Sequence, residues 1–119
     1  MTKLLLPLCL LFLILTQPAF ALFDNYKFIS AGEVKEKLEQ KAPMTLVDIQ
    51  VKEEFAQHHI LNAVATYAYP VESAEERSRM DDVISALKAN HDLAIVVCPR
   101  GGGGAKRAYA YLVESGIAE

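Results

Sequence analysis

The sequence predicts an α/β fold with a small parallel β-sheet and helices on both of its faces. Short apolar runs alternate along the chain with longer segments in which apolar residues recur every three or four positions. This alternation is typical of strands joined by helical crossovers. The run Leu93–Val97 is apolar at every position, as expected for a parallel strand that is covered on both sides.

The first 21 residues have the composition of a secretory signal peptide. Lys3 precedes an apolar run from Leu4 to Leu15, and Ala19-Phe20-Ala21 supplies a cleavage site of the small-x-small type. The competing interpretation is a membrane anchor, but the run is shorter than the roughly 20 residues that a spanning helix needs. We therefore expect cleavage after Ala21, a periplasmic or secreted protein, and no membrane anchor after cleavage.

The remaining chain, residues 22–119, is one small domain with a mildly acidic charge. It has enough residues for a single hydrophobic core. The whole chain carries 12 basic and 15 acidic residues, and Lys3 is the only charged residue of the leader, so 11 basic residues remain and the net charge becomes −4. A negative charge argues against nucleic acid as a partner.

The first half of the domain contains two predicted strands and a helix. Tyr26–Ile29 has the pattern of a short strand. Ser30 and Glu33 have the spacing of a capping box, which predicts that a helix begins there and ends before Pro43. Met44–Ile49 is almost entirely apolar and predicts a second strand.

The second half continues the alternation. Val51–His58 predicts one or two helical turns, and Ala63–Tyr67 predicts a third strand. Glu72–Ala89 carries the longest apolar stripe at helical spacing and predicts the longest helix. Leu93–Val97 is the fourth predicted strand, and Ala105–Glu114 is the last predicted helix.

Cys98 is the one cysteine that remains if Cys9 leaves with the signal peptide. A leftover cysteine in an exported protein indicates intermolecular pairing or a reactive thiol, although a buried small hydrophobe is also compatible with the count. Its position is more informative. Cys98 directly follows a predicted parallel strand, and ligands of open α/β sheets bind at the carboxyl ends of the strands.

The four glycines that follow, Gly101 to Gly104, indicate a loop that binds an anion. Glycine lets successive backbone N–H groups turn toward one point, and the N-terminus of the next helix adds partial positive charge. Such surroundings favour the thiolate form of a cysteine. Arg100, Lys106 and Arg107 add further positive charge. A merely flexible loop would account for the glycines but not for the cysteine at the end of a strand.

Other cysteine and glycine motifs fit less well. A nucleotide-binding P-loop needs Gly-Lys followed by Ser or Thr, whereas the glycines here precede Ala105, Lys106 and Arg107. A cysteine phosphatase loop needs an arginine six residues after the cysteine, where this chain has Gly104. A thioredoxin motif needs a second cysteine at position 101. Cys98 and the histidines have no recognisable metal-site spacing, so no metal is expected.

From about Phe28 to Gly116, three stretches of the chain are similar in order and spacing to the motifs of one known family. Residues 46–50 with Glu54-Phe55 are similar to the family's strand, Asp-x-Arg and Glu-Tyr/Phe elements. His59-Ile60 followed by Ala63 is similar to its Gly-His-Ile-Pro-Gly-Ala stretch. Residues 95–101 and 105–108 are similar to its strand, six-residue active-site loop and following helix. In these three parts together, the chain resembles the rhodanese family of sulfurtransferases.

The chain departs from the family pattern at three places. Gln50 stands where the arginine is usual, and Leu61-Asn62 replaces Pro-Gly. Gly103-Gly104 replaces a common Arg/Thr-Ser pair, which removes side-chain contacts to the substrate and moves the positive charge to Arg100. Polysulfide or a protein persulfide is therefore a better expected donor than thiosulfate.

The resemblance implies an exported sulfurtransferase that moves sulfane sulfur from a polysulfide or thiosulfate donor, through a persulfide, to a thiol or cyanide acceptor. No cofactor is required. The alternative is a catalytically weak binding or sulfur-carrier module with the same fold. The implied site consists of Cys98 as the nucleophile, Arg100, Gly101, Gly102, Gly103 and Gly104 around the substrate, and Asp48, Lys106 and Arg107 in support.

The resemblance also gives an expectation for the C-terminal end of the domain. A rhodanese-like domain normally continues after this helix with one more strand, a turn and a closing helix. Ile117–Glu119 is too short for a strand, which takes about five or six residues. We therefore expect a sheet without its last strand, whose exposed edge favours association with a second copy of the chain.

Overall fold

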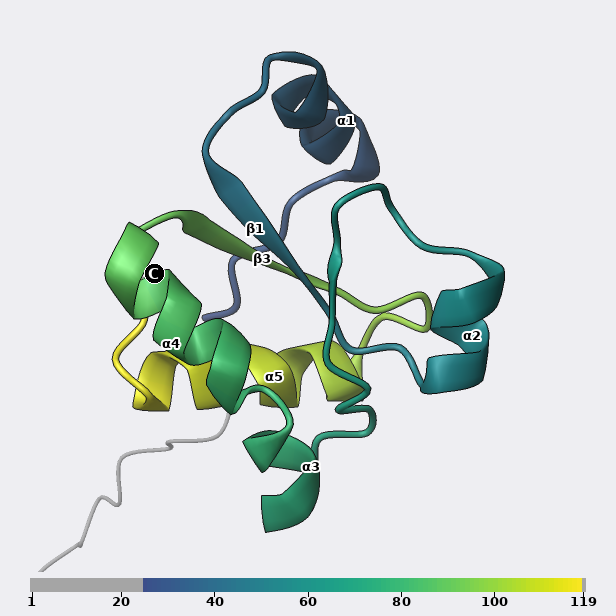
Figure 1. Ribbon diagram of the computed structural model, residues 1–119, viewed down its shortest axis with the longest axis vertical. Helices are drawn as coiled ribbons and strands as arrows, with labels where there is room; N and C mark the ends of the chain where they lie inside the picture. Colours follow the sequence, from purple (N-terminus) through teal and green to yellow (C-terminus); the bar gives the residue numbers. More distant parts are fainter. Residues whose placement is uncertain (1–24, 119) are drawn as a thin grey trace, which may run out of the picture.

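The computed structural model describes residues 25–118, which form a three-stranded parallel sheet with helices packed around it (Figure 1). This confirms the predicted fold class. The predicted signal peptide lies outside the described residues. The elements in chain order are α1 (Ala31–Glu39), β1 (Met44–Asp48), α2 (Lys52–Gln57), β2 (Val64–Ala65), α3 (Ala74–Ser78), α4 (Asp81–Asn90), β3 (Leu93–Val97) and α5 (Gly103–Glu114).

The sheet has the order β2-β1-β3, so the most buried strand is in the centre. Both pairs of strands are parallel, and Asp48 at the end of β1 is in register with Ala65 of β2 and Val97 of β3. The ladder continues one residue further, because the Ile49 N–H donates to the Val97 carbonyl at 3.1 Å. Since the strands are parallel, their carboxyl ends meet at one edge of the sheet, and Cys98 follows directly there.

The hydrophobic core lies between one face of the sheet and the two helices α4 and α5. Figure 1 shows these helices next to each other along the same side of β1 and β3. Successive side chains of a strand point to opposite faces, and the core takes the face that carries Val47. Its buried members are Val47, Ile49, Ala68, Val71, Met80, Val83, Ile84, Leu87, Ala108 and Leu112.

Two of the predicted helix boundaries need correction. The single helix predicted over residues 72–89 is two helices, α3 and α4, because the chain turns at Arg79 and Met80. The Met80 side chain is fully buried in the core, which takes the chain away from the axis of the exposed, polar α3. The last helix begins at Gly103, two residues before the predicted start.

The prediction of a strand at Tyr26–Ile29 is wrong. This segment is irregular. It lines an apolar groove of about 250 Å³ together with β3, and its Tyr26 ring contacts the Tyr109 ring of α5, with 5.3 Å between the centroids. Tyr109, Leu112 and Val113 of α5 also line the groove. The strand predicted at 63–67 is present but shorter, at Val64–Ala65.

The remaining predictions of elements are confirmed. The Ser30 hydroxyl accepts a hydrogen bond from the Glu33 N–H at 3.1 Å and so starts α1 at the expected position. The helix predicted over 51–58 is α2, and β3 has the predicted bounds. Within residues 25–118, no helix is long and apolar enough to cross a membrane.

Candidate active site

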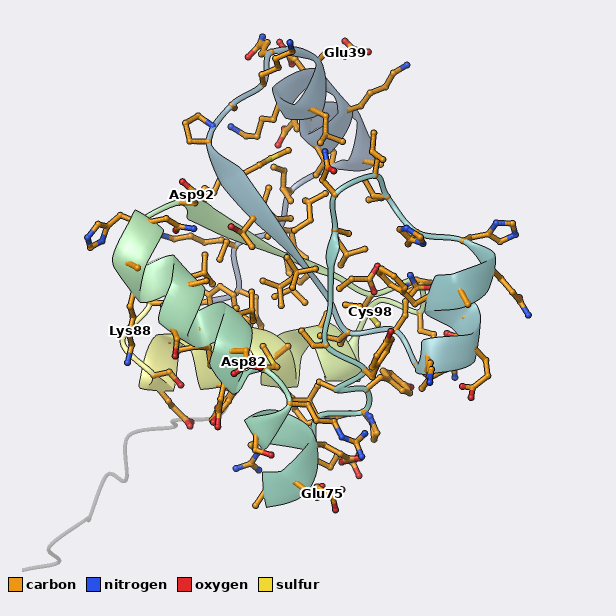
Figure 2. The ribbon with its side chains drawn as sticks, in the orientation of Figure 1. Glu39, Glu75, Asp82, Lys88, Asp92 and Cys98 are labelled. Carbon is orange, nitrogen blue, oxygen red and sulfur yellow. The ribbon has the colours of Figure 1, made fainter. Side chains whose placement is uncertain are left out.

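Cys98 lies at the carboxyl end of β3, at the start of the loop that leads into α5. Its side chain is half-buried and packs against the hydrophobic core. The Gly101 N–H donates to the Cys98 carbonyl at 3.1 Å, so the loop turns tightly directly after the cysteine. Figure 2 shows Cys98 at the end of the sheet on the side where α2 lies.

The N-terminus of α5 follows this turn and supplies backbone donors. Its first internal hydrogen bond runs from the Lys106 N–H to the Gly102 carbonyl at 3.0 Å. The N–H groups of Gly103, Gly104 and Ala105 therefore have no carbonyl partner within the helix. The first turn of α5 contains no acidic residue. This end of the helix carries partial positive charge and suits a bound anion.

The glycines of the loop are required for two different reasons. Gly102 caps α5 with a φ of 77°, a left-handed conformation that side chains with a Cβ rarely adopt. Gly104 is buried, and a Cβ there would lie 2.8 Å from two ring carbons of Tyr69. At Gly103 the nearest neighbour of an added Cβ would be the flexible end of Arg107. The tightest packing constraint in the loop is therefore at Gly104.

Tyr69 is part of the site although its sequence context does not indicate this. Its half-buried ring packs against Gly104 on the α5 side. The guanidinium carbon of Arg100 lies 4.9 Å from the centroid of the same ring. Tyr69 therefore contacts both ends of the glycine loop. These contacts depend on the path of the chain between β2 and α3, which no local motif predicts.

Arg100 also contacts α2. One of its guanidinium nitrogens, Nη2, forms an ion pair with Oε1 of Glu54. The hydrogen bond from Arg100 to Glu54 and the charge of that carboxylate raise the pKa of Arg100 further above its usual value. The sequence resemblance includes Glu54, but it does not indicate that Glu54 binds the loop.

Lys106 and Arg107 have other partners. The Lys106 ammonium lies 5.2 Å from the centre of the Tyr26 ring. The Arg107 guanidinium donates from Nε to the Pro70 carbonyl at 2.9 Å, and its Nη2 lies 3.4 Å from Oε1 of Glu72. The three cations near Cys98 thus bind three different groups instead of converging on one point.

Asp48 is completely buried at the end of β1. Its Oδ1 accepts the Gln50 backbone N–H at 2.9 Å, and its Oδ2 accepts the Gln50 side-chain amide at 2.8 Å. The same amide also donates to the His58 carbonyl at 3.1 Å. Asp48 therefore connects β1 to the end of α2. Because Asp48 is in register with Val97, its side chain leaves the opposite face of the sheet from Cys98.

A hollow of about 460 Å³ lies beside the loop on the α2 side. Arg100 and Glu54 both line it, together with Pro99, the residue directly after Cys98. The other lining residues are Asp48, Gln50, Gln57, His58, His59, Ile60 and Val97. Among residues 25–118, no three His, Cys, Asp or Glu side chains are grouped so that they could hold a metal ion.

The fold and the site define a parallel α/β domain with a cysteine between its edge strand and a helix that begins with glycine. A family model described as "Rhodanese-like domain" matches residues 30–119. The chain therefore belongs to the rhodanese-like domain family, which confirms the family indicated by its motifs. Membership suggests chemistry of the sulfurtransferase type. A search of curated proteins and a search of solved structures each find no match.

Proposed function

We propose that the protein is an exported single-domain sulfurtransferase that carries sulfane sulfur as a persulfide on Cys98. The observation that carries this proposal is the position of Cys98. It is half-buried at the carboxyl end of β3 and is followed by a tight turn and the amide-rich N-terminus of α5. A thiolate and a persulfide are both anions, and both are stabilised by backbone N–H groups and by the positive end of a helix.

In the first step the Cys98 thiolate attacks the outer sulfur of the donor. A bond forms between Sγ and this sulfane sulfur while the S–S bond of the donor breaks, and its electron pair leaves with the donor thiolate. With thiosulfate the leaving group is sulfite. The N–H groups of Gly103, Gly104 and Ala105 stabilise the transferred sulfur, while Pro99 has no N–H to donate.

In the second step a thiol or cyanide attacks the sulfane sulfur on Cys98. The new bond forms to the acceptor, the S–S bond to Sγ breaks, and the electron pair returns to Cys98 as a thiolate. The first step exchanges one S–S bond for another. In the second step the S–S bond to Sγ is replaced by a new S–S bond when the acceptor is a thiol, or by the S–C bond of thiocyanate when it is cyanide, so no external oxidant or reductant is needed. The chemistry requires only the thiolate and its electrostatic surroundings.

The transfer reaction tests this function. The purified protein is supplied with polysulfide and cyanide, and the formation of thiocyanate is followed against a protein-free control. We expect repeated turnover for the wild type and no catalysed turnover for Cys98→Ser. Turnover by the serine variant at the wild-type rate would contradict the proposed role of Cys98.

A sulfur-carrier or binding module is the second candidate function. It is supported by the pairing of Arg100 with Glu54 and of Arg107 with Glu72, which compensates two of the positive charges near the loop. A carrier would accept one sulfur atom on Cys98 but release it to small acceptors only slowly. The thiocyanate assay distinguishes the two candidates, because the carrier would give at most one product molecule per protein molecule.

The proposed location rests on the leader sequence. Lys3, the apolar run and Ala19-Phe20-Ala21 support export and cleavage. N-terminal sequencing of the protein recovered from an exporting host tests this directly. We expect the mature chain to begin at Leu22, and a chain that retains Met1 would contradict the proposal.

A further inference from the structure

The loop between Cys98 and α5 contains a single side-chain cation, Arg100. Its guanidinium group is held from two directions. Nη2 pairs with Glu54 of α2, and the guanidinium carbon lies 4.9 Å from the centre of the Tyr69 ring. An aromatic face attracts a cation through its quadrupole. Arg100, two residues after Cys98, is thus held by the protein itself.

Glu54 is well placed to hold Arg100. It lies in the first turn of α2, where the helix dipole favours a negative charge. Gln50, the polar residue that follows β1, has other partners than Arg100: its side-chain N–H groups donate to Asp48 and to the His58 carbonyl. The exposed fractions of the Glu54 and Arg100 side chains are 35% and 52%, so the pair is shielded from solvent in part.

The neighbouring cations do not replace Arg100. The Arg107 guanidinium binds the Pro70 carbonyl and lies 3.4 Å from Glu72. The Lys106 ammonium lies over the ring of Tyr26. Arg100, Lys106 and Arg107 are therefore each in contact with another group of the protein, and the N–H groups at the start of α5 are the anion-binding groups considered for the site.

Donors of sulfane sulfur differ in the group that accompanies the sulfur. Thiosulfate carries a sulfonate head whose oxygen atoms are best bound by a side-chain cation, and arginine suits such oxyanions especially well. An organic persulfide ends in sulfur and has no oxyanion beside the sulfane atom. We propose, on the basis of the function proposed above, that Glu54 is a specificity-determining residue that withholds Arg100 from the substrate and so selects organic persulfides over thiosulfate.

The test compares two donors with the full-length chain. The second-order rate constant for sulfur loading of Cys98 is measured by intact mass in single-turnover experiments, once with thiosulfate and once with cysteine persulfide. The informative quantity is the ratio of the thiosulfate constant to the persulfide constant. A general loosening of the loop changes both constants together, whereas release of Arg100 changes the ratio.

In Glu54→Gln we expect the ratio to rise about tenfold, the effect of one additional hydrogen bond from a charged group to the sulfonate. The rise should shrink with added salt. The double variant Glu54→Gln/Arg100→Gln should return to the wild-type ratio, because the gain requires Arg100. The matched control is Glu53→Gln, which removes the same charge from the neighbouring exposed residue of α2 and should leave the ratio unchanged.

An unchanged or lower ratio in Glu54→Gln, with a melting temperature close to that of the wild type, would overturn the inference. Glu54→Ala provides the same comparison if the glutamine variant folds poorly. The two proposals fail in different ways. If the wild type takes sulfur from persulfide but the ratio of rate constants does not change in Glu54→Gln, only the proposed role of Glu54 is overturned. A wild-type protein whose Cys98 takes sulfur from neither donor overturns both proposals.

Discussion

The ring of Tyr69 lies against the backbone of Gly104, so close that a Cβ on Gly104 would be 2.8 Å from two of the ring carbons. Gly104 is buried in the first turn of α5, and Tyr69 also lies beneath the guanidinium of Arg100. This contact determines how closely the N-terminus of α5 approaches the segment that follows β2. The position of the first amides of α5 therefore depends on it.

Gly104→Ala should destabilise the protein by about 1–3 kcal/mol, the range for inserting a methyl group into a packed site. It should also slow sulfur loading of Cys98, because the first turn of α5 must move. The matched control is Gly103→Ala, where the methyl group meets only the flexible end of Arg107. Urea denaturation measures both variants. Equal stability of the two would show that the Tyr69 contact does not position the helix.

A second prediction concerns the buried carboxyl group of Asp48. Gln50→Ala removes the amide that donates to Asp48 Oδ2 at 2.8 Å and leaves a fully buried oxygen without that partner. We expect a loss of about 1–3 kcal/mol in the free energy of unfolding. Gln57→Ala, at an exposed position of α2, is the control and should change stability by less than about 0.5 kcal/mol. If Gln50→Ala lowered the free energy of unfolding by less than about 0.5 kcal/mol as well, the connecting role given to Asp48 would be contradicted.

The third prediction follows from a bond between α4 and α5. The Tyr111 hydroxyl donates to Asp81 Oδ1 at 2.6 Å, and this hydrogen bond, with burial and the charge of Asp81, raises the pKa of Tyr111 above 10.0. Because the folded-state pKa is the higher one, the bond contributes stability below the pKa of the unfolded chain. That contribution is lost as the pH rises through the folded-state pKa.

The comparison of wild type with Tyr111→Phe tests this pH dependence. Below about pH 9 the variant should be less stable by under about 1 kcal/mol, since the pair lies near the surface. The difference should shrink as the pH rises above about 10. Thermal melting of both proteins across this pH range measures the difference in stability. A difference between wild type and Tyr111→Phe that grows with pH would contradict the prediction.

The fourth prediction concerns the capping box at the start of α3. The Ser73 hydroxyl accepts the Glu76 N–H at 3.1 Å, and the Ser73 N–H donates to the Glu76 carboxylate at 2.9 Å. Ser73→Ala should cost about 1 kcal/mol. Ser78→Ala is the control, because the Ser78 hydroxyl only donates back to the Glu75 carbonyl of the same helix.

Acid should weaken the same capping box. The backbone N–H of Ser73 is the main cause that lowers the pKa of Glu76 below 4.5. A lowered folded-state pKa contributes stability above the unfolded pKa, and this is lost as the pH falls through the folded-state value. The stability difference between wild type and Glu76→Gln, which removes the titrating carboxylate, should therefore narrow below about pH 4. A difference that is constant from neutral pH to pH 3 would contradict this assignment.

The local order of elements could be predicted from the sequence because it depends on neighbouring residues. The apolar run Leu93–Val97 and the hydroxyl of Ser30 determine β3 and the start of α1, and both lie where expected. Cys98 was assigned to the end of a strand for the same reason. The local pattern does not predict the break between α3 and α4, since burial of Met80 depends on the core as a whole.

The partners of the loop could not be predicted in this way. Arg100 pairs with Glu54 and stacks on Tyr69, and both contacts join segments that are distant in the sequence. Which carboxylate an arginine selects depends on the path of each loop after folding. The composition of the loop indicated positive charge around Cys98, but the structure shows that much of this charge is already paired.

The most direct test of the account is the mass of the intact protein after exposure to an organic persulfide. The account predicts that the wild-type chain gains the mass of one sulfur atom, that peptide mapping places it on Cys98, and that cyanide removes it. Cys98→Ser should gain nothing. A wild-type chain that gains no sulfur under these conditions, or a sulfur atom that cyanide does not release, would contradict the assignment of Cys98 as a carrier of sulfane sulfur.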